Sequence, residues 1–156
     1  MPLCLCGHFE YGHRGRVRPL QWFIHDQKNK KPIDDLFRAN LTSRVYDVAR
    51  ETPLEPAAKL SHRLSNEILL KREDLQPVVS FKIRGAYKKM THRSEDKLKK
   101  GVVATSAGSH AQGVVYAARQ LDVRAVIVMP LTTPAIKVDA VRAMGAEVVL
   151  AGDTYA

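Results

Sequence analysis

The sequence has few cysteines and aromatic residues, and it contains no long hydrophobic run. Its 156 residues include two cysteines, Cys4 and Cys6, both ahead of any periodic segment. Two cysteines this close to one end cannot staple a core, so we expect no disulfide framework. Paired ligands at finger spacing are also missing, so we expect no metal. No stretch approaches the roughly 20 consecutive apolar residues of a membrane span, so we expect no membrane partner.

Aromatic residues make up 6% of the chain, whereas its formal charge is +9. Eight lysines and arginines fall between Lys82 and Lys100, where only Glu95 and Asp96 oppose them. Such a cluster attracts anions, but nucleic-acid recognition would add interleaved aromatic side chains for base stacking. We therefore interpret the cluster as a solvated basic face and expect no nucleic-acid partner.

Residues 1–31 show neither helical nor strand periodicity, and we expect them to form an irregular N-terminal arm. The first 25 residues contain Arg14, Arg16 and Arg18 against one acid, Glu10, a charge pattern similar to that of a transit peptide. They contain no Ser or Thr, in which transit peptides are rich. We expect a cytoplasmic protein, with a plastid address as the alternative.

From Gly101 onward, short apolar runs alternate with segments of helical periodicity. The expected elements are strands at Val102–Thr105, Ala125–Met129 and Glu147–Leu150, and helices at 109–121 and 133–145, the second capped by Thr133 and ended by Gly145. Strands that alternate with helices predict parallel βαβ units. The expected fold class is therefore α/β, a parallel sheet with flanking helices.

The part of the chain before Gly101 is less regular, but it still contains recognisable start and stop signals. We expect helices at Asp34–Asn40, at Ala57–Leu64, from Phe81 to about Met90 behind a Ser80 cap and from Ser94 to Gly101, an extended segment at Thr52–Pro56, and a strand at Ile68–Leu70.

Lys82 lies at the start of one predicted helix, in the run Ser80-Phe-Lys-Ile-Arg-Gly-Ala86. A nucleophilic lysine needs an uncharged amine, and the positive end of a helix dipole disfavours an ammonium while it favours nearby anions. Arg84 would add positive charge, and Phe81 offers an apolar face of the size of an aromatic ring. We interpret Lys82 as a Schiff-base lysine for an anionic, aldehyde-bearing cofactor. The alternative is a surface lysine on an amphipathic helix.

A loop of small residues, Ser106-Ala107-Gly108-Ser109, lies between a predicted strand and a predicted helix. Backbone N–H groups at a helix start have no partner within the helix, so this loop predicts a nest for a carboxylate or a phosphate. His110 follows it as a candidate general acid or a structural residue. Loops of this kind are common, so the loop alone is not specific.

Three longer runs, Leu70–Tyr87, Thr105–Gly113 and Val126–Val141, are much more specific when they are taken together. They resemble the biosynthetic threonine dehydratases (threonine ammonia-lyases), fold-type II pyridoxal-phosphate enzymes of isoleucine synthesis with a fold like that of tryptophan synthase β. The likeness extends from about Leu41 to Tyr155. It implies that residues 32–156 are the N-terminal portion of a catalytic domain that is incomplete in this chain.

The resemblance also implies roles for individual residues. Lys82 would bind pyridoxal phosphate and remove the Cα proton of the substrate, while Phe81 would pack against the cofactor ring. Ser109 stands where the family has an asparagine that contacts the ring hydroxyl of the cofactor. The implied reaction is the dehydration and deamination of L-threonine to 2-oxobutyrate and ammonia. The substrate carboxylate would bind to the loop formed by Ser106, Ala107, Gly108, Ser109 and His110.

The chain departs from the family pattern in several respects. The Ser109 side chain reaches less far than asparagine. Val79 precedes Ser80 where a larger residue is usual, which trims the pocket wall. The family's glycine-rich phosphate loop, the hydroxyl residue that faces the pyridine nitrogen and the regulatory domain have no counterpart in these residues. We therefore expect the 156 residues alone to bind the cofactor poorly and to turn over no threonine.

Two alternatives stay open from the sequence. One keeps the fold and the cofactor but dehydrates or racemises serine. The other is a catalytically inactive, truncated product that associates with intact subunits. For the enzyme, the expected partners are a small amino-acid substrate and, in the full-length form, further copies of itself.

Overall fold

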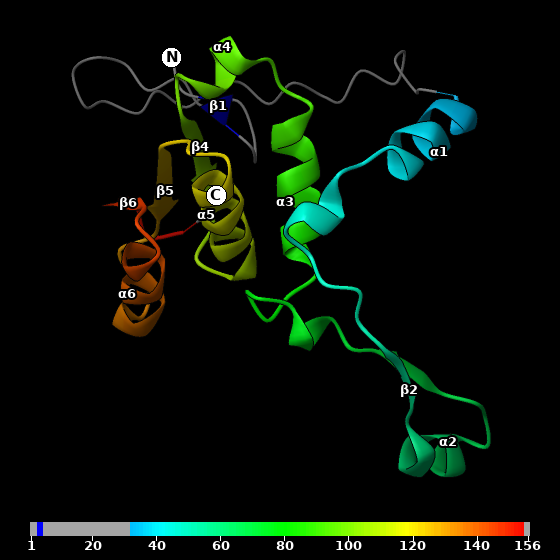
Figure 1. The fold of residues 1–156 in the computed structure, drawn as a ribbon. Coiled ribbons are helices and arrows are strands. Elements are labelled where there is room, and N and C mark those ends of the chain that lie inside the picture. The colour runs from blue at the N-terminus through cyan, green and yellow to red at the C-terminus, as the bar shows by residue number, and fades with distance from the viewer. Residues whose placement is uncertain (1–2, 5–31, 155–156) are drawn as a thin grey trace.

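The computed structural model describes residues 3–4 and 32–154 and contains a four-stranded parallel sheet, drawn on the left of Figure 1. Its strand order is β1-β4-β5-β6. The strands are β1 (Leu3–Cys4), β4 (Val102–Thr105), β5 (Ala125–Met129) and β6 (Glu147–Leu150). Val102 lies opposite Ala125, and Val126 lies opposite Glu147, with every pair of strands parallel. The predicted α/β class is confirmed.

The strand β1 comes from the segment that the sequence predicts to be irregular. Leu3–Cys4 pair in parallel with β4, with Leu3 opposite Val102. The expectation of an irregular arm thus does not hold at these two residues. The rest of that prediction, including Cys6, lies outside the described residues.

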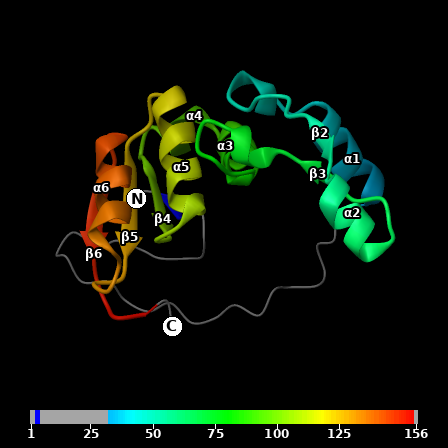
Figure 2. The ribbon, with the colours of Figure 1, turned by 90° about the horizontal axis from the view of Figure 1, so that it is seen from below.

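Helices α5 (Ser109–Gln120) and α6 (Ala135–Ala143) cover one face of the sheet, as Figure 2 shows. The described helices are α1 (Ile33–Leu41), α2 (Ala58–Leu64), α3 (Lys82–Thr91), α4 (Glu95–Leu98), α5 (Ser109–Gln120) and α6 (Ala135–Ala143). On the covered side, Ala104 and Ile127 of the sheet join Val114 and Ala118 of α5 in the buried core. All four have 0% exposed surface. Helix α3 in turn packs against α5, which extends the core sideways. None of the described helices has the length and apolar character that a membrane crossing requires.

A second, two-stranded sheet projects from this body together with α2 (Figure 1). The strands β2 (Leu54–Pro56) and β3 (Leu69–Lys71) are antiparallel, and Leu54 lies opposite Lys71. Two single-turn 3-10 helices, η2 (Val45–Asp47) and η3 (Glu73–Leu75), flank this unit along the chain. The predicted extended segment and the predicted strand therefore pair with each other and not with the parallel sheet.

The start of α3 differs by one residue from the prediction. The helix begins at Lys82, and Phe81 occupies the N-cap position with helical backbone angles. The Lys82 N–H donates to Ser80 Oγ at 3.2 Å, so Ser80 still satisfies a free donor of the first turn. Lys82 is consequently the first residue of the helix.

The predicted cap of α6 is wrong. Pro134 holds the N-cap position, and the Thr133 N–H instead donates to the Pro130 carbonyl at 3.0 Å in a preceding turn. Thr133 thus lies one residue before the N-cap position, and its buried Oγ1 has no hydrogen-bond partner among the described residues. Gly101 and Gly145, with φ of +82° and +94°, follow α4 and α6 as expected for residues that end helices.

Candidate active site

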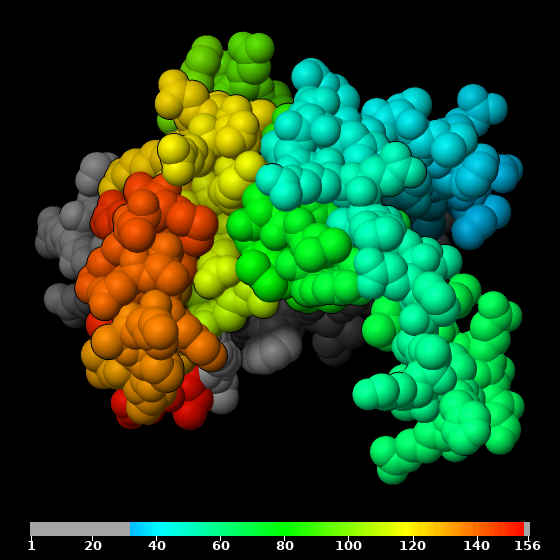
Figure 3. All heavy atoms as spheres, turned by 60° about the horizontal axis from the view of Figure 1, so that its bottom comes forward, coloured from blue at the N-terminus to red at the C-terminus, as the bar shows by residue number. Residues whose placement is uncertain are grey.

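The helices α5 and α6 begin where β4 and β5 end, so both loops meet at the carboxyl edge of the sheet. Helix α3 begins at the same end of the molecule (Figure 1). Figure 3 brings this end forward and shows the start of α5, in yellow-green, between α6 in orange and α3 in green. The candidate site is thus built from three helix starts.

The amine of Lys82 projects from the first residue of α3. Its Nζ lies 5.1 Å from the centroid of the neighbouring Phe81 ring. It forms no hydrogen bond and no ion pair with any residue in the described ranges. The Phe81 side chain is 58% exposed, so its ring also remains open to a ligand.

Gly113 brings α5 into direct contact with the start of α3. A Cβ at this position would lie 3.1 Å from the carbonyl carbon of Lys82 and 3.2 Å from the Ile83 nitrogen. These distances are tighter than ordinary van der Waals contacts, so a Cβ at this position would require the backbone of α3 to shift by a few tenths of an ångström. The approach places the backbone of Lys82 beside the first two turns of α5.

The loop before α5 presents backbone donors that are free in the described structure. The Ser106 N–H is occupied by Val128 O at 3.1 Å, and the Gly108 N–H by Ser106 Oγ at 3.2 Å. The N–H groups of three further residues have no acceptor among the described residues: Ala107, Ser109 and His110. This is the donor arrangement that an anion needs at a helix start.

The imidazole of His110 is half-buried in the first turn of α5. Its Nε2 is buried and has no hydrogen-bond partner among the described residues. Burial lowers the pKa of His110, and the positive charge of Lys82 lowers it further. The ring is therefore held in its neutral form at pH 7, with one nitrogen able to accept a hydrogen bond.

A shallow depression of about 430 Å³ adjoins this loop. It is lined by Thr105, Ser106, Ala107 and Gly108 from the β4–α5 connection, and by Lys137 from the first turn of α6. Lys137 is a residue that the sequence analysis missed, although it lies within one of the quoted motifs. A basic residue in the first turn of the helix that follows the next parallel strand was the available signal. Lys82 does not line this depression.

The expectation that Arg84 adds positive charge beside Lys82 is wrong. Its guanidinium is paired with Glu73, at 2.8 Å from Nε to Oε2 and 2.9 Å from Nη2 to Oε1. The carboxylate offsets the charge of Arg84, so the positive potential at the site comes from Lys82, Lys137 and the helix starts.

The fold and these groups define a class of protein. It is an α/β protein in which a lysine amine, unpaired backbone N–H groups and a neutral histidine lie at helix starts near the carboxyl edge of a parallel sheet. That combination serves small, anionic ligands with a carbonyl group.

Comparisons with known proteins identify the family. Residues 45–156 match the family of pyridoxal-phosphate dependent enzymes, and the chain belongs to this family. It is 59% identical over 124 residues to the biosynthetic L-threonine dehydratase IlvA of Burkholderia multivorans, covering 78% of this chain and 24% of that protein. It is 60% identical over 115 residues to the biosynthetic, chloroplastic threonine dehydratase 1 of Solanum lycopersicum, covering 74% of this chain and 19% of that protein.

Solved structures give the same picture. The processed form of threonine deaminase isoform 2 from Solanum lycopersicum matches with a TM-score of 0.73 and 55% identity, over 80% of this chain and 35% of that one. Maize serine racemase matches with a TM-score of 0.72 and 29% identity, over 79% of this chain and 37% of that one. The predicted resemblance and the predicted fold type are confirmed, and the chain spans about a quarter or less of the curated relatives above.

The residues present fit pyridoxal phosphate, the cofactor of the family. An amine without a partner, such as that of Lys82, can condense with its aldehyde. The exposed Phe81 ring can lie against its pyridine ring, and the donors around Ser109 can receive an anionic group. The buried Nε2 of His110 has no hydrogen-bond partner among the described residues, and the charge of Lys82 is near enough to lower the pKa of this imidazole.

Proposed function

We propose that this chain forms the lysine-bearing portion of a threonine dehydratase, which converts L-threonine to 2-oxobutyrate and ammonia. The observation that carries the proposal is that the Lys82 amine has no hydrogen-bond or ion-pair partner among the described residues, while the Lys82 backbone lies against Gly113 in a helix whose first N–H groups are free. Sequence identity supports the substrate class, because it is 59% and 60% to threonine dehydratases but 29% to a serine racemase of the same fold.

Each group of the site has a task in this reaction. Pyridoxal phosphate, when it is bound, supplies an electron sink for the Cα of the substrate. Lys82 Nζ would hold the cofactor and would accept the Cα proton, because an amine without an ion-pair partner is free to do both. The N–H groups of Ala107, Ser109 and His110 would bind the substrate carboxylate, together with the Ser106 hydroxyl and the Gly108 backbone around them.

Two side chains would orient the cofactor ring. Phe81 would pack against it, and the hydroxyl of Ser109 would donate to or accept from the ring hydroxyl. Because Ser109 is exposed at the first position of α5, its short side chain can turn toward a ligand without leaving the helix. The neutral imidazole of His110 would accept a hydrogen bond from a ligand without adding charge.

The serine-directed and inactive alternatives make different predictions. A serine enzyme would respond to L-serine as strongly as to L-threonine. An inactive product would lack any lysine-dependent cofactor binding. In the proposal, the full-length enzyme is a homo-oligomer in the cytoplasm, as suits the bacterial relative, or in a plastid, as the name of the tomato relative suggests.

The test is capture of the cofactor by Lys82. Because these 156 residues alone are expected to bind the cofactor poorly, addition of millimolar pyridoxal phosphate to the chain is expected to produce a weak absorbance band of lysine-bound cofactor. Condensation releases water, and borohydride then supplies hydride to reduce the C=N bond to a stable C–N bond, so that mass spectrometry can locate the label. Lys82→Ala should abolish both the band and the label at this site, whereas Lys89→Ala, on an exposed part of the same helix, should retain both.

Three results would contradict the proposal in separable ways. Equal labelling of wild type and Lys82→Ala would show that Lys82 is not the lysine that binds the cofactor. Absence of any band at millimolar cofactor would favour the inactive product. A spectral response to L-serine equal to that for L-threonine would favour the serine alternative.

A further inference from the structure

Arg84 and Glu73 form a two-pronged ion pair on one side of the start of α3. Arg84 donates through Nε to Glu73 Oε2 at 2.8 Å and through Nη2 to Oε1 at 2.9 Å. The side chains are 25% and 16% exposed, so this pair is less solvated than the other ion pairs of the described residues. Two parallel hydrogen bonds restrict both the distance and the orientation of a guanidinium.

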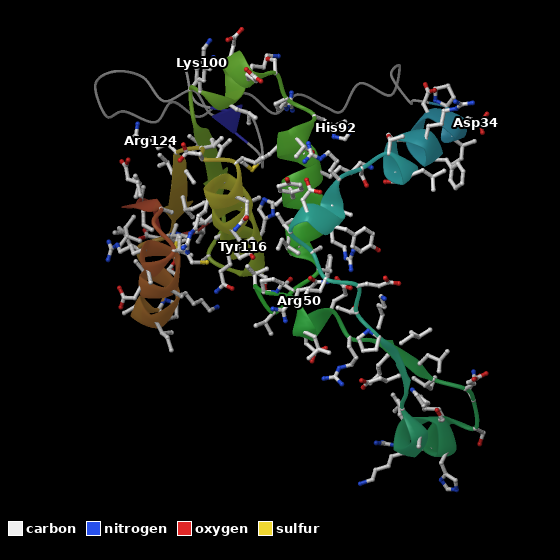
Figure 4. The ribbon with its side chains drawn as sticks, in the orientation of Figure 1. Asp34, Arg50, His92, Lys100, Tyr116 and Arg124 are labelled. Atoms are coloured by element: carbon white, nitrogen blue, oxygen red, sulfur yellow. The ribbon has the colours of Figure 1, made fainter. Side chains whose placement is uncertain are left out.

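The pair is hydrogen-bonded to a third segment of the chain, residues 50–52. The buried Gln76 donates to the Arg50 carbonyl at 2.8 Å and accepts from the Arg50 N–H at 2.9 Å. Arg84 Nη2 donates to the same carbonyl at 3.0 Å, and Thr52 Oγ1 donates to Glu73 at 2.6 Å. In Figure 4, Arg50 lies at the base of α3. The start of α3 is therefore connected to two segments that are distant in sequence.

The position of this network relative to Lys82 follows from helix geometry. Residues two apart in a helix are separated by about 200° around its axis, so Lys82 and Arg84 point to nearly opposite sides. On the side toward α5, Gly113 contacts the backbone of Lys82. On the other side, Glu73 holds Arg84. Two contacts on opposite sides of one helix turn leave it little freedom to rotate.

We propose that Glu73 and Arg84 are positioning residues that set the rotation of α3 and so hold the Lys82 amine beside the first turn of α5. The inference rests on the proposed function, since it concerns the same lysine. Neither residue touches the reacting atoms. Their effect is on where the amine stands, and an error of a fraction of a turn would change the direction in which Nζ projects from the start of α3.

The local chemistry suits a fixed support better than a loose surface pair. Hydrogen bonds from Arg84, and also from Thr52 and Gln76, hold the pKa of Glu73 at about 2, although burial opposes this effect. Glu73 is thus ionised at neutral pH. By comparison, the neighbouring Asp74 pairs only with Arg72 and is half exposed, so it forms no link to α3.

The experiment measures where pyridoxal phosphate is captured, with borohydride trapping and mass spectrometry on the whole chain. The readout is the ratio of label at Lys82 to label at Lys89, a lysine of the same helix. A merely loosened fold would label both lysines alike and would also lower this ratio, so the fold of each variant has to be checked alongside. The expected result for Glu73→Gln is a roughly tenfold fall in the ratio, a typical effect of removing a support of a site. The matched control Asp74→Asn removes the same charge one residue away and should change the ratio less than about twofold.

Arg84→Lys tests the geometry separately from the charge. A lysine keeps the cation but cannot form two parallel hydrogen bonds, so the ratio should again fall, whereas a role of the charge alone would leave it unchanged. Far-UV circular dichroism confirms the fold of each variant, and Arg84→Lys decides the question if Glu73→Gln does not fold. Variants that capture cofactor at Lys82 as the wild type does would overturn the positioning role. A wild type without preference for Lys82 would instead overturn the proposed function.

Discussion

Val79 has a φ of +53°, in the left-handed region that β-branched residues rarely adopt. Its N–H donates to the Gln76 carbonyl at 2.8 Å, which closes the turn that leads into Ser80 and Lys82. The side chain is 71% exposed, so little packing compensates for the strain. The strained residue thus lies three positions before the candidate catalytic lysine, and backbone strain is often found near active sites in enzymes.

Val79→Gly is expected to stabilise the chain by about 1 kcal/mol, because glycine removes a left-handed penalty of about 1–2 kcal/mol and loses part of it to a freer unfolded state. Urea unfolding followed by circular dichroism measures the change. Val79→Ala keeps a Cβ and should therefore raise the free energy of unfolding by less than Val79→Gly. A lower unfolding midpoint for Val79→Gly than for wild type would show that the turn is not strained.

Some site residues were predictable one by one, and others were not. Lys82 and the loop from Ser106 to His110 lie in contiguous motifs, so the sequence alone pointed to them. The pairing of Arg84 with Glu73 spans 11 residues, and its bond to the Arg50 carbonyl spans 34. The fold brings together partners at such separations, so the local sequence predicts a free charge at Arg84 where the structure has an ion pair.

Among the elements, the contact between α3 and α5 decides whether the site exists. It depends on Gly113, where an added Cβ would lie 3.1–3.2 Å from the backbone of Lys82 and Ile83. Gly85, on α3 itself, offers the reverse case, since an added Cβ there would meet nothing within 4 Å. The two glycines therefore form a matched pair for one substitution.

Gly113→Ala is expected to destabilise the chain by about 1–3 kcal/mol, because the two helices must separate to admit a methyl group. Gly85→Ala should stabilise it by up to about 1 kcal/mol, because alanine is the better helix former. Thermal melting of both variants tests this, and Gly113→Ala should also lose cofactor capture at Lys82. Equal effects of the two substitutions would refute the close approach.

The elements themselves were largely predictable, because their periodicity is local. Helix α5 was expected at 109–121 and occurs at Ser109–Gln120, and β5 has the expected bounds. The misplaced cap at Thr133 shows the limit of this approach. Whether a hydroxyl caps a helix depends on the turn before the helix. Here the hydrogen bond from the Thr133 N–H to the Pro130 carbonyl keeps Thr133 in that turn, outside the N-cap position.

At the scale of the whole molecule, the network around Glu73 joins the projecting β2–β3 unit to the α/β body. Glu73 lies directly after that unit, and Arg84 belongs to the helix that packs on α5. The pKa of Glu73 is lowered from 4.5 to about 2 by the hydrogen bonds that its carboxylate accepts, chiefly from Arg84. The stabilisation from this carboxylate is complete above pH 4.5 and is lost as the pH falls toward 2.

The free energy of unfolding of the wild type should therefore fall between pH 4.5 and 2, and Glu73→Gln should remove part of this dependence. Urea unfolding at pH 7, 4 and 2.5 gives the comparison: the difference between wild type and variant should shrink as the pH falls. Glu95→Gln, on the exposed helix α4, is the matched control. A difference that stays constant with pH would show that the charge of Glu73 does not hold the two parts together.

The strand order β4-β5-β6 repeats the order of the chain, so β5 pairs with β4 and β6 pairs with β5. Val102 and Ala125 are 23 residues apart, and Val126 and Glu147 are 21 apart, so every addition closes a short loop. During synthesis, β5 and then β6 can therefore pair with a strand that is already formed. The carboxyl edge of the sheet, where the candidate site lies, would then form while the chain is still emerging from the ribosome.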